Sequence, residues 1–215
     1  FSELAGERVR EEWFQWSGKS TLPSAGLGFL EMTEWIDHFP EIKALRGTPQ
    51  DPEWHPEGDV LTHTGHCCDA LVKLPEWRAS DGESRIVYSL AVLTHDFGKP
   101  STTQRVEKDG RNRVTSPGHE VEGVALADAF LQRIHAPGGI RARVLPLVAN
   151  HMVHYQEVTD RAVRRLARRL EPENIHGLGI VMSADQAGRP PLQATVSKTV
   201  QALLVKAEEL QVKQN

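Results

Sequence analysis

The sequence predicts an all-α fold that carries one small β-hairpin. Apolar residues recur at spacings of three and four along most of the chain, which is the period of an amphipathic helix. The exception is Thr102–Thr115, where Asp109-Gly110 separates two short strand-like runs, as in an exposed hairpin. With 215 residues, 39% of them apolar, the chain is long enough to bury the core of one domain.

Apolar periodicity predicts nine helices along the chain. In chain order they span Glu7–Trp16, Gly28–Phe39, Asp59–Leu74, Ser84–Asp96, Pro117–Ile134, Gly139–His154, Thr159–Leu170, Glu173–Ala187 and Val196–Val212. Ser116-Pro117 and Thr159-Asp160 are typical helix starts, and Gly188 with Pro190-Pro191 is a typical stop. The Gly47–Gly58 stretch, rich in proline and acidic residues, is expected to link an N-terminal helical piece to the main body.

Composition and charge limit the classes of protein that this chain can belong to. No apolar run is long enough to span a bilayer, and no leader is visible, so we expect a soluble protein with no membrane partner. The two cysteines, Cys67 and Cys68, are adjacent and form no disulfide framework, which favours a reducing, cytoplasmic location. We expect both to be small buried apolar residues.

The formal net charge of -4 argues against a protein that coats nucleic acid by bulk electrostatics, but it allows a local basic patch. Four arginines recur at helical spacing around Val163, Leu166 and Leu170: Arg161, Arg164, Arg165 and Arg168. They form either a solvated helix face or a surface that contacts the phosphates of an RNA such as tRNA.

The most informative motif is Leu93-Thr94-His95-Asp96-Phe97-Gly98-Lys99. An apolar helix delivers an adjacent His-Asp pair to its C-terminal end, where Gly98 stops the helix and both side chains can turn toward one ion. Imidazole nitrogens and carboxylate oxygens are common ligands of divalent metals, and a carboxylate can bridge two ions. The sequence therefore predicts a metal ligand pair at His95 and Asp96.

Further candidate ligands lie on or near separate helices. They are His63, His119, His151 and Asp185. Each alone is more often a hydrogen-bonded core or surface residue than a ligand, but the order His, His-Asp, His, His, Asp is specific as a set. We therefore predict a metal site built by side chains that converge from several helices.

This pattern resembles the HD metal-dependent phosphohydrolase superfamily, which implies an HD-type helical bundle with an N-terminal helical extension. The resemblance implies that His63, His95, Asp96 and Asp185 match the mononuclear ligand set and that His119 and His151 match the addition of the dinuclear form. Asp96 would then bridge two divalent ions, which could be Mn, Ni, Co, Mg or Fe. His119 and His151 would hold the second ion.

A closer resemblance is to the HD region of bacterial tRNA nucleotidyltransferases of the CCA-adding family. It rests on Gly-Glu-Arg-Val-Arg-Glu-Glu, Pro-Ser-Ala-Gly-Leu-Gly-Phe-Leu, Asp-Pro-Glu-Trp-His-Pro-Glu-Gly-Asp-Val, His-Asp-Phe-Gly-Lys-Pro and Gly-His-Glu, and it runs from about Gly6 to Pro191. The Gly-Ser and paired-aspartate motifs of that family's catalytic head are missing, so nucleotide addition is not predicted. The resemblance divides the chain into a neck-like segment and linker at 1–55, an HD metal-binding domain at 56–192 and a C-terminal helix at 193–215.

The resemblance implies a phosphomonoesterase or phosphodiesterase that acts on nucleotides or on RNA 2′ and 3′ phosphate ends. Two alternatives stay open: a diiron oxygenase with the same six ligands, and an RNA-binding part of a tRNA-processing enzyme. Lys99 and Arg189 are candidates for contacting a phosphate, although either could be an inert surface residue.

Several neighbours of the predicted ligands leave the assignment open. His66 lies one helical turn from His63 and His154 one turn from His151, so either could be a ligand, an acid or a supporting group. Asp69 and Glu120 could orient ligands, but a structural role is the expectation.

Overall fold

A computed structural model describes residues 6–108, 110–153, 158–191 and 198–210 of the chain. Its elements are α1 (Gly6–Lys19), α2 (Pro23–Met32), the 3-10 helix η1 (Trp35–His38), α3 (Pro40–Lys43), α4 (Val60–Leu71), α5 (Pro75–Ala79), α6 (Gly82–Thr94), α7 (Lys99–Thr102), β1 (Gln104–Lys108), β2 (Arg111–Thr115), α8 (His119–Arg133), α9 (Gly138–Asn150), α10 (Asp160–Leu170), α11 (Ile175–Ala187) and α12 (Lys198–Glu209). The fold is therefore all-α with one small hairpin, as the sequence predicts.

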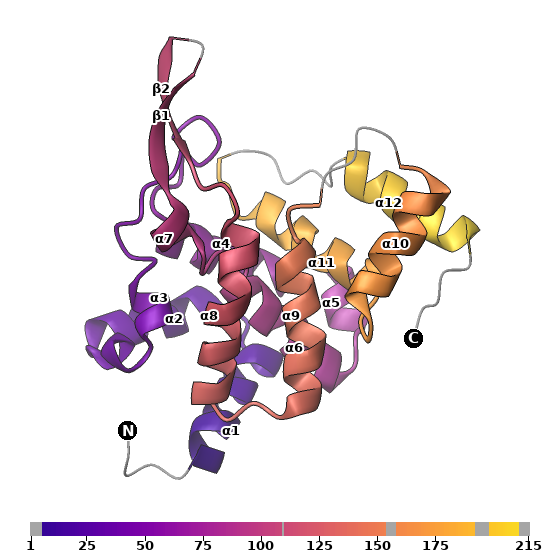
Figure 1. The fold of residues 1–215 in the computed structure, drawn as a ribbon. Helices are drawn as coiled ribbons and strands as arrows, with labels where there is room; N and C mark the ends of the chain where they lie inside the picture. The colour runs from indigo at the N-terminus through magenta and orange to yellow at the C-terminus, as the bar shows by residue number, and fades with distance from the viewer. Residues whose placement is uncertain (1–5, 109, 154–157, 192–197, 211–215) are drawn as a thin grey trace.

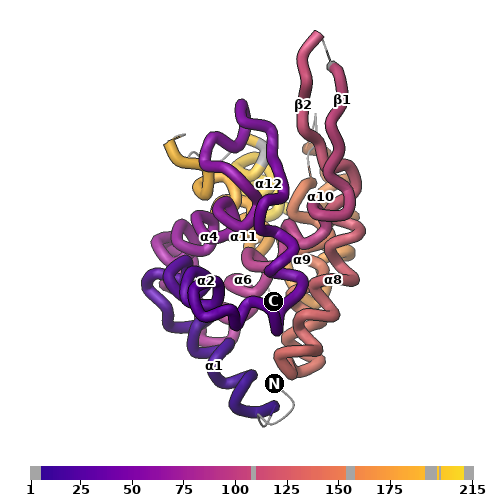
Figure 2. The backbone as a smooth tube through the Cα atoms, turned by 90° about the vertical axis from the view of Figure 1, so that its left-hand side faces the viewer, coloured from indigo at the N-terminus to yellow at the C-terminus, as the bar shows by residue number. Residues whose placement is uncertain are grey.

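Helix α6 lies at the centre of the bundle. It packs against α1, α4, α9 and α11, and Figure 2 shows these helices surrounding it. Every residue from Val87 to Thr94 is buried. A helix that is apolar on all sides is stable only when other helices cover all of it. Because α6 is enclosed, the residues that follow it emerge inside the protein rather than at its surface.

The β-hairpin projects from one end of the helical bundle (Figure 1). Strands β1 and β2 pair antiparallel, with Gln104 opposite Thr115 and Lys108 opposite Arg111. Gly110 at the turn has a φ of 70°, a conformation that glycine adopts without strain. The predicted hairpin is confirmed, although Asp109 lies outside the described residues.

Side-chain caps fix the starts of four helices. Asp59, Asp81, Thr159 and Asn174 each accept a hydrogen bond from the backbone N–H three residues later, at the N-termini of α4, α6, α10 and α11. The predicted start at Thr159 and the predicted stop at Gly188 are both confirmed. None of the described helices combines the length and apolar character needed to cross a bilayer.

Two local predictions were wrong. The single helix expected over Gly28–Phe39 is two elements, because Glu34 adopts a left-handed conformation with a φ of 61° between α2 and η1. The helix expected from Pro117 begins at His119 instead, after Gly118 with a φ of 76°. Apolar periodicity continues across both breaks, so it could not reveal them.

Aromatic side chains join the N-terminal helices to the main bundle. The ring of Phe130 on α8 packs edge-on against Trp13 of α1, with centroids 5.0 Å apart, and against Phe97, 5.6 Å away. All three side chains are buried. Since Phe97 directly follows Asp96, this cluster also holds the His95-Asp96 turn against the core.

We expect Phe130→Ala to lower the free energy of unfolding by roughly 3–5 kcal/mol, because it removes a buried ring and leaves a cavity. Val121, on the same helix but 68% exposed, provides the control. Val121→Ala should change stability by less than about 0.5 kcal/mol. Urea denaturation measures both, and equal effects would contradict this account of the core.

Candidate metal centre

The His95-Asp96 pair lies in the turn that follows α6, and both side chains are buried. Asp96 is only 1% exposed. A buried carboxylate is unfavourable unless cations or hydrogen-bond donors surround it. The chain supplies four histidines and one lysine around it, from α4, α7, α8 and the segments that follow α6 and α9.

The two oxygens of Asp96 face two different groups of side chains. Oδ2 lies 3.2 Å from Nε2 of His95 and 3.8 Å from Nε2 of His63. Oδ1 lies 3.3 Å from Nε2 of His119 and 3.9 Å from Nε2 of His151. Asp185, near the end of α11, completes the first group, with Oδ1 3.1 Å from Nε2 of His63. The structure thus brings the other five predicted ligands together around the carboxylate of Asp96.

A contact at Nδ1 orients each of the four histidines. Nδ1 of His95, His119 and His151 donates to a backbone carbonyl three residues earlier, 2.7 Å away in each case. In His63, Nδ1 lies 2.7 Å from Oε1 of Glu57. Metal-binding histidines characteristically donate their second ring nitrogen in this way, which leaves Nε2 free to bind.

Hydrogen bonds within the protein do not satisfy every ring nitrogen around Asp96. Nε2 of His95 makes no hydrogen bond, although Oδ2 of Asp96 is close. Nε2 of His119 and Nε2 of His151 face each other at 3.2 Å. Nδ1 donates in both rings, so this contact is a hydrogen bond only if one Nε2 also carries a proton. Burial would lower the pKa of His119, but Asp96 and the carbonyl of Ser116 raise it, which favours that proton on His119. An ion bound at the two Nε2 atoms would take the place of that proton, so the residues fit a metal ion.

The surroundings of some candidate ligands favour the deprotonated form that binds a metal, and those of others favour the protonated form. Burial, together with the nearby charge of His95, lowers the pKa of His151 to about 3, so this ring is neutral at pH 7. Burial would raise the pKa of Asp96, but His95, Lys99 and His119 hold it well below its ordinary value. The carboxylate is therefore ionised, as a bridging ligand must be.

His63 behaves differently. Burial would lower its pKa, but Cys67 and the hydrogen bonds to Asp185 and Glu57 raise it well above the ordinary value. The imidazolium then donates from both nitrogens, to Glu57 and to Asp185. An ion bound at Nε2 would take the place of that proton.

Close backbone contact brings His119 to Asp96. A Cβ on Gly98 would lie 2.1 Å from the carbonyl oxygen of His119 and 2.7 Å from the backbone nitrogen of Gly123. Only glycine permits the first turn of α8 to approach the turn after α6 this closely. Gly98 therefore does more than stop a helix, which is all that the sequence predicted for it.

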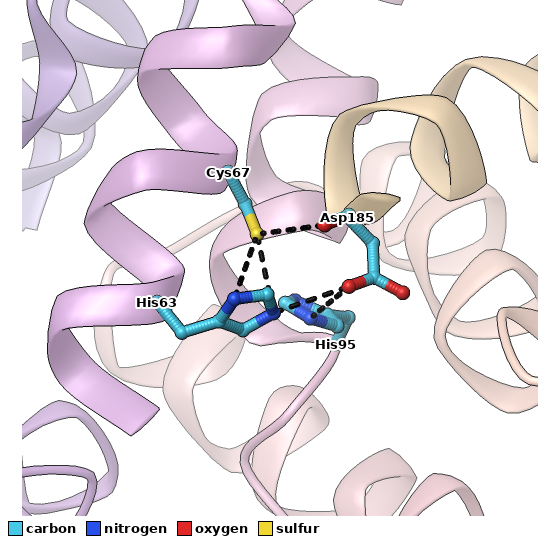
Figure 3. Close-up of side chains that lie close together, drawn as sticks. All are labelled: His63, Cys67, His95 and Asp185. Atoms are coloured by element: carbon cyan, nitrogen blue, oxygen red, sulfur yellow. Dashed lines mark hydrogen bonds and ion pairs between the residues drawn. The ribbon is translucent and has the colours of Figure 1, made fainter. Parts of the chain in front are cut away.

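Cys67 lies next to the first ligand group, as Figure 3 shows. Its sulfur is 3.3 Å from Nε2 and 3.7 Å from Nδ1 of His63, nearly equidistant from the two nitrogens. This places the sulfur against the ring rather than in line with the Nε2 lone pair. Cys67 and Cys68 are both buried, as expected, and Cys67 packs the His63 ring in place.

The other residues singled out from the sequence separate into two sets. Lys99 and Arg189 line a cavity of about 590 Å³ that opens onto Asp96, His119 and His151. Nζ of Lys99 lies 2.7 Å from Oδ2 of Asp96 and donates to Gln50. These two cations are therefore beside the metal centre.

The second set lies outside the centre or at its margin. His66 lines a different pocket, and Asp69 accepts hydrogen bonds from the backbone and hydroxyl of Ser24, which tie α2 to α4. Glu120 is partly exposed, with Oε2 3.8 Å from Nδ1 of His119. His154 lies outside the described residues.

Sequence reasoning missed the contribution of the segment expected to be a linker. Oε1 of the buried Glu57 contacts His63 and also Nδ1 of His55, 2.9 Å away. His55 lines the cavity, and its ring meets that of His63 edge-on at 4.7 Å. The Trp-His-Pro-Glu run was part of the family resemblance and could have signalled this role.

We expect Glu57→Gln to weaken metal binding roughly 10- to 100-fold, because the neutral amide supports the His63 ring less well than a carboxylate. Calorimetric titration with Mn²⁺ or Zn²⁺ measures the change. Glu53→Gln, in the same segment but half-exposed, should bind metal like the unmodified protein. Unchanged affinity in Glu57→Gln would contradict the supporting role of Glu57.

Comparison with known proteins agrees with this geometry. The chain is 34% identical over 193 residues to the "Multifunctional CCA protein" of Xanthomonas campestris pv. campestris (strain B100), which covers 86% of this chain and 44% of that protein. The protein of the same name from Vibrio vulnificus (strain YJ016) is 28% identical over 205 residues, or 89% of this chain and 45% of that protein.

The chain thus spans less than half the length of these curated relatives. The family model of the HD domain matches residues 64–187, which is more than half of the chain and includes five of the six predicted ligands. The chain therefore belongs to the HD domain family, within the superfamily of metal-dependent phosphohydrolases.

Proposed function

We propose that this protein is a dinuclear metal-dependent phosphohydrolase that acts on nucleotides or on RNA 2′ and 3′ phosphate ends. One observation carries the proposal: the oxygens of a single buried carboxylate, Asp96, face two separate groups of ligand atoms. Asp185 and His63 belong to the Oδ2 group, and His119 and His151 belong to the Oδ1 group. A bridging carboxylate between two such groups is suited to a pair of divalent ions.

The protein's own groups would hold the substrate beside the ions. Two divalent ions supply Lewis-acid charge for the phosphoryl oxygens and a water of lowered pKa. Lys99 and Arg189, both in the wall of the cavity, would bind non-bridging oxygens of the phosphate. Lys99 now pairs with Oδ2 of Asp96, and its ammonium group would be available to the substrate once bound cations neutralise that carboxylate.

The proposed substrate class rests on the size of the cavity and on the relatives. A volume of about 590 Å³ lies in the range typical of small-molecule sites and is large enough for a nucleotide. The relatives carry the name "Multifunctional CCA protein", which is consistent with a substrate at an RNA end. The exposed arginines of α10 would then contact the RNA backbone. Within the described residues, no ion pair engages Arg161, Arg164, Arg165 or Arg168, so their charges are available for phosphates.

We expect Asp96→Asn to abolish binding of both ions and to lower hydrolysis at least about a thousandfold, equivalent to roughly 4 kcal/mol of transition-state stabilisation. His151→Ala should lose one ion and keep the other, since His63, His95 and Asp185 are untouched. Metal content by elemental analysis gives two, one and no ions for the unmodified protein, His151→Ala and Asp96→Asn.

Activity is measured on a panel of nucleoside 2′-, 3′- and 5′-phosphates, cyclic phosphates and deoxynucleoside triphosphates, with Mn²⁺, Ni²⁺, Co²⁺, Mg²⁺ or Fe²⁺. Glu122→Gln, an exposed carboxylate on α8, is the matched control and should be fully active. The proposal is refuted if both ions remain bound in Asp96→Asn, or if no member of the panel is hydrolysed with any metal.

The RNA-binding role of α10 has a separate test. Replacing Arg164, Arg165 and Arg168 together with glutamine should weaken tRNA binding and reduce its salt dependence by about one unit of log-log slope for each phosphate that an arginine no longer neutralises. Hydrolysis of a mononucleotide should be unchanged. Arg8→Gln on α1, also exposed, is the control, and filter binding at several salt concentrations gives the slopes. A slope identical to that of the unmodified protein would show that α10 is only a solvated helix face.

A further inference from the structure

The cavity over the metal centre has large apolar side chains at its rim. Trp54 is 58% exposed and Met152 is 52% exposed, and both line this cavity. Neither is needed to hold an ion or a phosphate. Large exposed apolar side chains beside a polar cavity are typical of a surface that a ligand covers.

The two side chains stand beside different ligand groups. Trp54 directly precedes His55, whose ring contacts His63 in the first group. Met152 directly follows His151 of the second group. A molecule whose phosphate lay over the centre would therefore have apolar surface available next to either group.

The segment that carries Trp54 is anchored at several points. The carboxylate of Asp51 accepts from the backbone nitrogen of Val114 at 3.3 Å and pairs with Arg113 at 3.1 Å, which ties the segment to strand β2. The backbone nitrogens of Trp54 and His55 both donate to the carbonyl of Asp51. Glu57 ties its other end to His63. The indole is thus presented from a fixed backbone, which lowers the entropic cost of binding against it.

We propose that Trp54 stacks on the base of the substrate, with Met152 as a second apolar contact, so that the enzyme takes phosphoesters that carry a nucleobase in preference to other phosphoesters. The inference rests on the proposed function and specifies its substrate class. Stacking on an aromatic ring accepts every base because each has a π face. Both adenosine and cytidine substrates should therefore benefit from Trp54.

The test compares adenosine 5′-monophosphate with ribose 5-phosphate, which has the same phosphate and sugar but a hydroxyl group in place of the base. In the metal-loaded protein, Trp54→Leu should raise KM for the nucleotide roughly 5- to 100-fold, from the usual contribution of one stacked base. It should leave kcat, and KM for ribose 5-phosphate, nearly unchanged. Trp54→Phe keeps a ring and should restore most of the affinity.

Trp35→Leu is the matched control, since Trp35 is 44% exposed but lines a different pocket. Mn²⁺ affinity, measured on each variant, shows whether the anchored segment keeps its structure. Equal KM values for the two substrates in the unmodified protein would overturn the stacking proposal and leave the phosphohydrolase proposal intact. So would a Trp54→Leu variant that weakens both substrates alike, or a Trp54→Phe variant no better than Trp54→Leu. If neither 5′-phosphate is hydrolysed, the same comparison is made between the nucleotide of the panel that is hydrolysed and the corresponding ribose phosphate. Hydrolysis of no member of the panel would overturn both proposals.

Discussion

The burial of one ionised carboxylate, that of Asp96, is the constraint on which the rest of the structure depends. In the interior of a helical bundle such a charge is costly unless positive or donor groups surround it. The ammonium of Lys99 lies beside it, and the Nε2 atoms of four histidines face it from several directions. Nε2 of His95 has no hydrogen-bond partner, and Nε2 of His119 and His151 share one contact, so hydrogen bonds within the protein do not satisfy the whole site. Divalent cations would complete it.

The fold supplies this environment with a small number of devices. Helix α6 is enclosed by other helices, so its C-terminal turn carries His95 and Asp96 into the core. Gly98 lets the start of α8 approach that turn, which brings in His119. Helix α4 and the end of α11, which pack against each other, contribute His63 and Asp185 (Figure 3). Three of the rings are then oriented in the same way, because each Nδ1 donates to the carbonyl three residues before it.

The Asp51–Gly58 segment contacts both the candidate metal centre and the apolar rim of the cavity. It supports His63 through Glu57, contacts the hairpin through Asp51 and places Trp54 at the rim of the cavity. The cationic side chains of Lys99 and Arg189 therefore lie in the wall of the cavity, and apolar side chains lie at its edge. The centre that they surround is suited to phosphoester hydrolysis. A phosphate and an attached base are the two parts of a molecule that this arrangement would hold.

The sequence by itself determined the helical class and the hairpin, because periodicity and turn residues are local patterns. It also determined the six candidate ligands, because their order along the chain can be read without knowing how the helices pack. It also predicted the caps at Thr159 and Gly188, which depend on neighbouring residues alone. Only the tertiary structure decided which oxygen of Asp96 faces which histidine, that Glu57 rather than Asp69 supports a ligand, and that Gly98 permits a close backbone approach. Those facts depend on contacts between residues far apart in the chain, and such contacts are set by how helices pack, which no local pattern encodes.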